Sequence, residues 1–221
     1  MIVVILLWAP TLPMLAACIY AVLHWRVLPE KLIAIKYYIV ISLVVQLVGG
    51  MLWFFNINNL FLLHFYVPTA FILLIWFYRR VWYSYISSTL LSGLLYCFIL
   101  FSLLNSIFLQ DIFSFNTHGL TGLSILIIIF SLSNYYLFLD ANIRIQLGQL
   151  ITSINWINTG LFIYYTCTFL YHIYGRLINF DLPQSIGRLA LLPNALFVTI
   201  KYVCFFIGLW KSPKRQSLHQ S

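Results

Sequence analysis

Apolar stretches of about twenty residues follow one another along nearly the whole chain, with only short connections between them. A helix needs about 20 predominantly apolar residues to cross the hydrocarbon core of a bilayer, which is roughly 30 Å thick. Charged and turn-forming residues divide the sequence into seven such stretches, at 2–25, 35–55, 60–78, 84–104, 119–139, 149–173 and 189–210. The sequence therefore predicts an all-α, polytopic transmembrane helical bundle with seven spans.

Composition excludes a water-soluble globule. Of the 221 residues, 63% are hydrophobic and 7% are charged, so polar side chains are too few to cover a surface in contact with water. A transmembrane β-barrel needs alternating apolar and polar residues, whereas the stretch 123–132 is apolar on every face. We expect one seven-helix transmembrane domain at 1–211 and a short basic cytoplasmic tail at 212–221.

The distribution of Lys and Arg predicts the orientation, because the side of a membrane protein that is richer in these residues is cytoplasmic. If the first, third and fifth connections and the tail share one side, that side contains Arg26, Lys31, Lys36, Arg79, Arg80, Arg144, Lys211, Lys214 and Arg215. The other side keeps only Arg176 and Arg188. We therefore expect a multi-pass protein of the inner (plasma) membrane, with its N-terminus outside and its C-terminus in the cytoplasm. The net charge of +8 is then a topology signal, and the partner it predicts is the lipid bilayer rather than a nucleic acid.

The positions of the tryptophans agree with the predicted spans. Tryptophan prefers the membrane interface, and five tryptophans fall at predicted span ends, namely Trp25, Trp53, Trp76, Trp82 and Trp210.

The segment from Leu15 to Cys18 matches the pattern that precedes a lipid-modified cysteine, but a signal peptide also requires a Lys or Arg near its start, and none precedes Arg26. We therefore interpret 2–25 as the first span and the four cysteines as small buried hydrophobic residues.

Lys201 is the one basic residue well inside a predicted span, about 15 Å from Lys211 along the helix. A charge in mid-membrane costs at least about 2.5 kcal/mol, so such residues usually face the bundle interior or a water-filled cavity. Asn194 lies seven residues earlier on the same helix face. This pair predicts a ligand or partner pocket, while a lysine that only extends its stem toward the headgroups is the structural alternative.

Other polar side chains inside predicted spans are candidates for the same pocket: His64, Tyr66, Gln46 and Asn158. Side chains of this kind also join helices by hydrogen bonds in proteins without any site. His64 and His172 lie at similar depth and raise the question of a haem, and a lysine in a seventh helix raises that of retinal. The acids are Glu30, Asp111, Asp140 and Asp181, none of them inside a span where a retinal counter-ion would lie. We predict no cofactor and no metal, and the absence of hydrolase, metalloprotease and phosphate-loop motifs predicts no enzyme and no catalytic residues.

Three segments carry a resemblance to a known family: 58–80 (NNLFLLHFYVPTAFILLIWFYRR), 155–166 (NWINTGLFIYYT) and 205–211 (FFIGLWK). The chain resembles the uncharacterised seven-helix integral membrane proteins of bacteria, which are often predicted to be sensor-like or associated with histidine kinases. The resemblance implies a seven-helix bundle in a bacterial inner membrane, and it supplies no established activity. Lys201 departs from the pattern, in which a neutral or histidine-type residue is expected.

These observations favour a sensory, receptor-like or accessory subunit, which we expect to act through a partner membrane or signalling protein because no stretch is polar enough for an output domain. A small-solute or ion transporter or channel is the first alternative, with Gln46, Asn194 and Lys201 as polar steps. A structural subunit of a larger membrane complex is the second. The absence of acidic residues inside the spans makes an ion-coupled carrier less natural.

Overall fold

The computed structural model describes residues 8–82, 85–174 and 184–214, with the backbone alone for 184–191. This part of the chain is helical and contains no strand. Its elements are α2 (Thr11–Leu23), the 3-10 helix η1 (Glu30–Leu32), α3 (Ile33–Phe54), α4 (Phe61–Val81), α5 (Ser88–Leu104), the π-helical turn η2 (Asn105–Leu109), α6 (Thr117–Leu137), α7 (Ala141–Leu147), α8 (Leu150–Ile173) and α9 (Gln184–Trp210). The predicted all-α fold class is confirmed.

Local sequence determines where several helices begin and end. The side chain of Asn116 accepts a hydrogen bond from the Gly119 amide, and the side chain of Asp140 accepts one from the Asn142 amide, so each caps a helix N-terminus. Asn56, after α3, has a φ of 58°, and Gly148, after α7, has a φ of 50°. Asparagine and glycine tolerate this left-handed region better than other residues, which lets the chain reverse at both positions.

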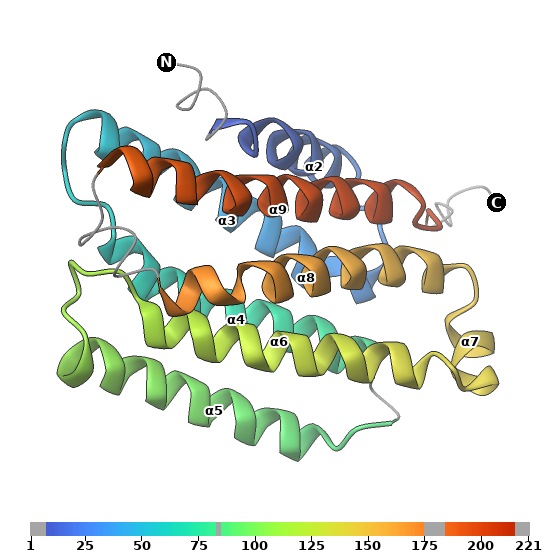
Figure 1. Ribbon diagram of the computed structural model, residues 1–221. Helices are drawn as coiled ribbons and strands as arrows, with labels where there is room; N and C mark the ends of the chain where they lie inside the picture. Colours follow the sequence, from blue (N-terminus) through green and yellow to red (C-terminus); the bar gives the residue numbers. More distant parts are fainter. Residues whose placement is uncertain (1–7, 83–84, 175–183, 215–221) are drawn as a thin grey trace.

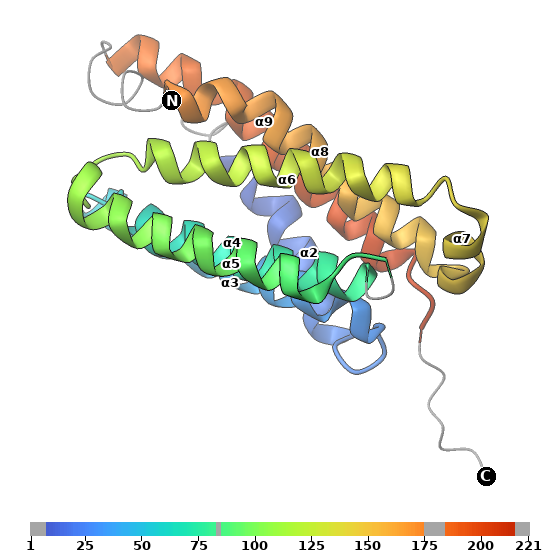
Figure 2. The ribbon, with the colours of Figure 1, turned by 90° about the horizontal axis from the view of Figure 1, so that it is seen from below.

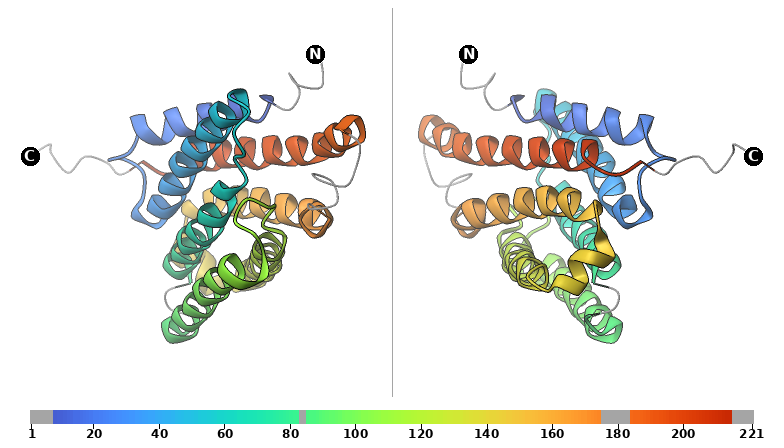
Figure 3. Two further views of the ribbon diagram at one scale, coloured as in Figure 1. Left: turned by 90° about the vertical axis from the view of Figure 1, so that its left-hand side faces the viewer. Right: turned by 90° about the vertical axis from the view of Figure 1, so that its right-hand side faces the viewer.

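The long helices pack as an antiparallel bundle (Figures 1 and 2). Helix α8 packs between α9 and α6, α2 covers α9 and α3, and α4 contacts α3, α5 and α6. Helix α5 lies at the edge of the bundle, as the end-on views in Figure 3 show. The arrangement places α8 and α9, the two most extensively packed helices, in contact along their length.

The connections alternate between the two ends of the bundle as predicted. Helix α7, the α2–α3 connection and the end of α9 lie at one end, on the right of Figure 1. At this end the guanidinium of Arg80 donates a hydrogen bond of 3.0 Å to the backbone oxygen of Glu30. Lys36, from the start of α3, donates one of 2.9 Å to the backbone oxygen of Trp25. We call this the basic end. Its assignment to the cytoplasm stays a prediction, and Arg176 and Arg215 lie outside the described residues.

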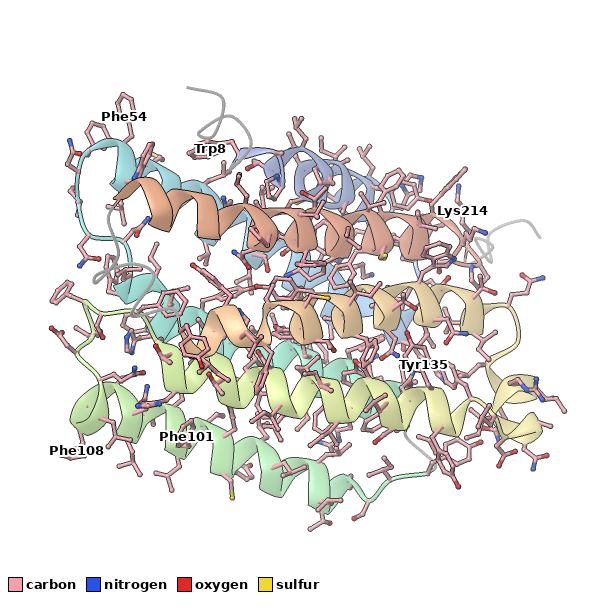
Figure 4. All side chains as sticks on the ribbon, in the orientation of Figure 1. Trp8, Phe54, Phe101, Phe108, Tyr135 and Lys214 are labelled. Carbon is pink, nitrogen blue, oxygen red and sulfur yellow. The ribbon has the colours of Figure 1, made fainter. Side chains whose placement is uncertain are left out.

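Five helices of the described chain are long and apolar enough to cross a membrane: Glu30–Phe54, Phe61–Val81, Ser88–Leu109, Thr117–Leu137 and Leu192–Trp210. Large apolar side chains cover the outside of the bundle, and Phe54 and Phe108 point away from it with 75% of their surface exposed (Figure 4). The protein is therefore a helical protein with several apolar helices of membrane-spanning length.

Two predicted spans do not reach that standard. The first, at 2–25, appears as the 13-residue helix α2, which at 1.5 Å per residue is only about 20 Å long, and residues 1–7 lie outside the described part. The sixth, at 149–173, forms the 24-residue helix α8, which is long enough but is absent from the five. Its polar asparagine, threonine and tyrosine side chains lower its mean hydropathy, and Asn158, Tyr165 and Thr168 among them are buried inside the bundle. Seven spans remain a prediction, and five are supported.

Candidate functional site

Lys201 lies in the interior of the bundle, surrounded by tyrosine rings. Its side chain is 3% exposed. The ammonium nitrogen Nζ lies 3.9 Å from the ring centre of Tyr164, 4.7 Å from that of Tyr202 and 5.5 Å from that of Tyr38. It also donates a hydrogen bond of 3.3 Å to the Tyr38 hydroxyl. We call Lys201 with these three tyrosines the lysine cage.

The cage brings together three helices that are distant in sequence. Lys201 and Tyr202 come from α9, Tyr164 from α8 and Tyr38 from α3. An aromatic ring attracts a cation through its negative face, and the attraction reaches about 2 kcal/mol when both groups are removed from water. The cage therefore offsets part of the cost of burying an ammonium group.

Tyr66 extends the cage through a chain of hydroxyl groups. Its hydroxyl donates a hydrogen bond of 3.1 Å to that of Tyr38, and it lies 2.9 Å from Oγ of Ser42. This chain joins α4 to α3 and then to Lys201. Tyr66 and Lys201, both candidates from the sequence, therefore belong to one connected group, with Tyr38 between them.

Within the described structure, the ammonium group of Lys201 contacts tyrosine rings and the Tyr38 hydroxyl rather than carboxylates. Glu30 and Asp140 lie at helix starts, Asp111 lies in the connection between η2 and α6, and Asp181 lies outside the described residues. An ammonium group in an apolar interior gains most from a negative charge within hydrogen-bonding distance. The cage therefore has the chemistry to receive an anionic group.

Removing the ring closest to the ammonium should weaken the protein, while removing its hydroxyl should not. We expect Tyr164→Leu to destabilise by about 1–2 kcal/mol, because the cation–π contact is lost, and Tyr164→Phe to leave stability nearly unchanged, because the ring remains. Thermal unfolding of both variants in the same detergent measures the difference. Equal losses in the two variants would show that the hydroxyl, and not the ring, is the important group.

Gln46 and Asn194 line a separate pocket of about 430 Å³, next to the cage and toward the end of the bundle opposite the basic end. Its walls come from the segment before α2, α3, α4, α8 and α9, and they include Gly49, Asn59 and Tyr171. The side-chain oxygen of Asn194 is buried and has no hydrogen-bond partner within the described structure. We call this cavity the side pocket. Its apolar walls with a few amide groups are typical of a site for a partly apolar ligand.

The side pocket is only one helical turn from the cage. Val198 lines the pocket, and Lys201 follows it by three residues on α9. Gln46 lines the pocket, and Ser42, which contacts Tyr66, precedes it by four residues on α3. One turn of helix rises about 5.4 Å, so a ligand seated in the pocket would have the cage within reach of its end.

Asn158 and His64 lie elsewhere and have bonded partners. Asn158 is fully buried, accepts a hydrogen bond of 2.8 Å from the Tyr78 hydroxyl and donates one of 3.1 Å to the backbone oxygen of Ser131. It therefore joins α8 to α4 and α6. His64 contacts Ser106 through Nδ1 at 2.8 Å and the Ser114 backbone oxygen through Nε2 at 3.3 Å. Both residues act as links between helices rather than as lining of the cage or the side pocket.

His172, the second histidine that raised the question of a haem, has its Nδ1 2.7 Å from Oγ of Ser124. Its ring lies 6.1 Å from that of Tyr164, which places it near the cage. Among the residues that the structure describes, no group of three or more His, Cys, Asp or Glu is placed to hold a metal ion.

Lys201 is identifiable from the sequence, but Tyr38, Tyr164 and Tyr202 are not identifiable there as its partners. Tyr202 is the next residue, and Tyr164 belongs to the polar helix α8, but Tyr38 is 163 residues away in the sequence. Fifteen tyrosines are present, so residue type alone does not distinguish these three.

Comparison with known proteins adds no relative, because no family model, no curated protein and no solved structure matches the chain. The resemblance to seven-helix bacterial membrane proteins stays a prediction.

Proposed function

We propose that the chain is a receptor-like or accessory subunit of a bacterial inner membrane, which binds a small amphipathic anion and acts through a partner membrane or signalling protein. The observation that carries the proposal is Lys201, a buried cation held by tyrosine rings with no carboxylate among its described contacts. A ligand that supplies the negative charge converts a costly group into a specific binding contact.

The side pocket supports the amphipathic part of the proposal. Its walls are mostly apolar, and the amide groups of Gln46 and Asn194 provide a few polar contacts, while that of Asn59 donates a hydrogen bond of 2.8 Å to the Gly49 backbone oxygen. A hydrocarbon tail of medium length would occupy the pocket while the anionic end reaches Lys201, one helical turn away. A carboxylate of medium chain length fits this combination of a cation, tyrosine hydroxyls and an apolar cavity.

The proposal also gives a route for a signal. Lys201 and part of the wall of the side pocket belong to α9, which continues directly to the basic end of the bundle. A ligand that binds more tightly to one position of α9 shifts the helix toward that position, and this shift is what a partner at the basic end would detect.

Binding of dodecanoate to the purified full-length protein tests the proposal, with dodecanol as a neutral probe of the same length. We expect Lys201→Met to weaken dodecanoate binding at least tenfold, the loss of about one charge-assisted hydrogen bond, and to leave dodecanol binding unchanged. Lys36→Met is the matched control, because Lys36 is also a buried lysine but lies at the basic end and contacts Trp25. Unaltered dodecanoate binding in the Lys201 variant would contradict the proposal.

A further inference from the structure

A second pocket, at the basic end of the bundle, gathers cations from separate elements. It has a volume of about 470 Å³ and is lined by Glu30, Lys31, Trp76, Arg79, Arg80, Val81, Tyr85, Gln146 and Leu147. We call it the basic pocket. It shares no residue with the lysine cage or the side pocket. Its occupant is therefore independent of the ligand proposed for Lys201.

Three cations and one acid line the basic pocket. Lys31 comes from η1, and Arg79 and Arg80 come from the last turn of α4. Cations at the C-terminus of a helix stabilise it through the helix dipole, which accounts for the position of the arginines on α4. It does not account for Lys31, which belongs to another element and lines the same cavity. The excess of positive charge favours an anionic occupant.

Several polar groups of the pocket are held in place by their neighbours. The guanidinium of Arg80 lies 5.3 Å from the ring centre of Trp76, and its hydrogen bond to the Glu30 backbone oxygen uses one of its five N–H donors. The Tyr85 hydroxyl donates a hydrogen bond of 2.8 Å to the side-chain oxygen of Gln146, which orients both on the pocket wall. A planar guanidinium fixed in this way suits the tetrahedral oxygens of a phosphate group.

The pocket lies at the ends of two candidate membrane spans. Glu30 is the first residue of one candidate membrane span, and Arg79 and Arg80 fall in the last turn of the next one. Trp76, Val81 and Leu147 add apolar surface to its wall, which a free ion does not need but a glycerol backbone and the start of an acyl chain do. Basic pockets between helices at the end of a bundle recognise anionic headgroups.

We propose that the basic pocket binds the phosphate group of an anionic phospholipid, with Lys31 and Arg79 as its charged ligands and Arg80 as a fixed donor. A phosphate whose negative charge is not neutralised by a cation in the same headgroup is the chemistry that the pocket recognises, and the apolar wall selects the lipid over the free ion. Binding there would join η1, α4 and α7 at the end of the bundle where a partner protein would dock.

Native mass spectrometry of the full-length protein in a neutral detergent tests this assignment. The probes are phosphatidylglycerol and phosphatidylcholine with the same acyl chains. We expect tighter binding of phosphatidylglycerol, and we expect the double variant Lys31→Gln/Arg79→Gln to lower its affinity about tenfold or more. Binding of phosphatidylcholine should stay within twofold in both proteins.

Arg144→Gln is the matched control, since Arg144 is an exposed arginine of α7 at the same end and does not line the pocket. This variant should bind phosphatidylglycerol within twofold of the unaltered protein. A loss of about threefold or more in the control, half of a tenfold loss on the free-energy scale, would overturn the proposal, because the number of charges and not the pocket would then decide binding. Inorganic phosphate at 10-fold excess over the lipid should not displace it, and full displacement would assign the site to a soluble phosphate instead.

Discussion

Replacing Gly208 with leucine should destabilise the protein by about 3 kcal/mol, the upper part of the range for overpacked interiors. A β-carbon at Gly208 would lie 2.8 Å from Cγ1 of Ile157 and 2.9 Å from the backbone oxygen of Ser153. The second of these atoms belongs to the backbone of α8, which a rotamer change does not move. The two helices must separate, and small residues at this position are what allow their close approach.

The effect should extend to the lysine cage. Gly160 makes the corresponding close approach from α8, where a β-carbon would lie 2.8 Å from Cβ of Cys204 and 3.0 Å from the backbone oxygen of Lys201. Separation of α8 and α9 therefore moves Lys201 away from Tyr164, its closest ring. We expect Gly208→Leu to weaken dodecanoate binding as well as stability.

Gly93→Leu is the matched control, because no heavy atom lies within 4 Å of a β-carbon at Gly93 on α5. Cys97 and Cys167 are exposed, contrary to the expectation that all four cysteines are buried, and they give a thiol-specific dye a constant signal in the folded state. Thermal unfolding can be followed by the additional reaction of the buried cysteines Cys18 and Cys204. A loss of about 3 kcal/mol corresponds to a decrease in Tm of roughly 10 °C for a chain of this size. An unchanged Tm in Gly208→Leu would show that α8 and α9 are not packed as closely as the structure has them.

Helix positions in this protein could be predicted from the sequence because the bilayer leaves few choices. Backbone polar groups in hydrocarbon must bond within their own segment, so long apolar stretches become helices. The predicted stretches 35–55, 60–78, 119–139 and 149–173 agree with α3, α4, α6 and α8 within about three residues. The predicted stretch 84–104 agrees less closely, because α5 begins at Ser88 and continues through the π-helical turn to Leu109. The short helix α7 was missed, since seven residues capped by Asp140 produce no apolar stretch.

Part of the candidate site was predictable from the sequence: Lys201 and Tyr66 belong to one connected group, and Gln46 and Asn194 line the side pocket, but the tyrosines around Lys201 were not identified. Lys201 stands out because a cation inside an apolar helix needs compensation, and this argument requires no knowledge of packing. Its partners depend on which faces of α3, α8 and α9 meet, and the apolar residues on all sides of these helices give no periodicity that identifies those faces. For the same reason, Asn158 was predicted to be a pocket residue, although it forms hydrogen bonds with Tyr78 and Ser131 in the core.

The interface positions expected of the tryptophans at span ends were also only partly correct, because they too depend on how the helices pack. Trp53 and Trp210 are 53% and 63% exposed at the ends of α3 and α9, in agreement with the interface position expected from the sequence. Trp82 also follows the end of a helix, but it is 2% exposed and lies inside the bundle. For this residue the expectation of an interface position is wrong, because α6 lies over the end of α4 and covers the ring.

Trp82→Ala should therefore be the most damaging tryptophan substitution, with an expected loss of about 3–4 kcal/mol. The ring contacts those of Tyr78 and Phe130 with centroid distances of 4.8 and 5.4 Å, and its nitrogen donates a hydrogen bond of 3.0 Å to the side-chain oxygen of Asn134. Alanine leaves a cavity between α4 and α6 and removes a partner from a fully buried asparagine. Dispersion contacts with protein atoms on every side of the ring are lost, and lipid cannot replace them in an enclosed space.

Trp210→Ala separates this packing effect from the general loss of a tryptophan, because the Trp210 ring is mostly exposed and a lipid or detergent chain can occupy its place. We expect its Tm to stay within about 2 °C of that of the unaltered protein, while that of Trp82→Ala falls by roughly 10 °C. Trp82→Phe should recover about half of the loss, since a smaller ring still fills most of the space but cannot bond Asn134. If the two alanine variants unfolded at the same temperature, Trp82 would face the membrane interface after all, and the contact between α4 and α6 would have to be redrawn.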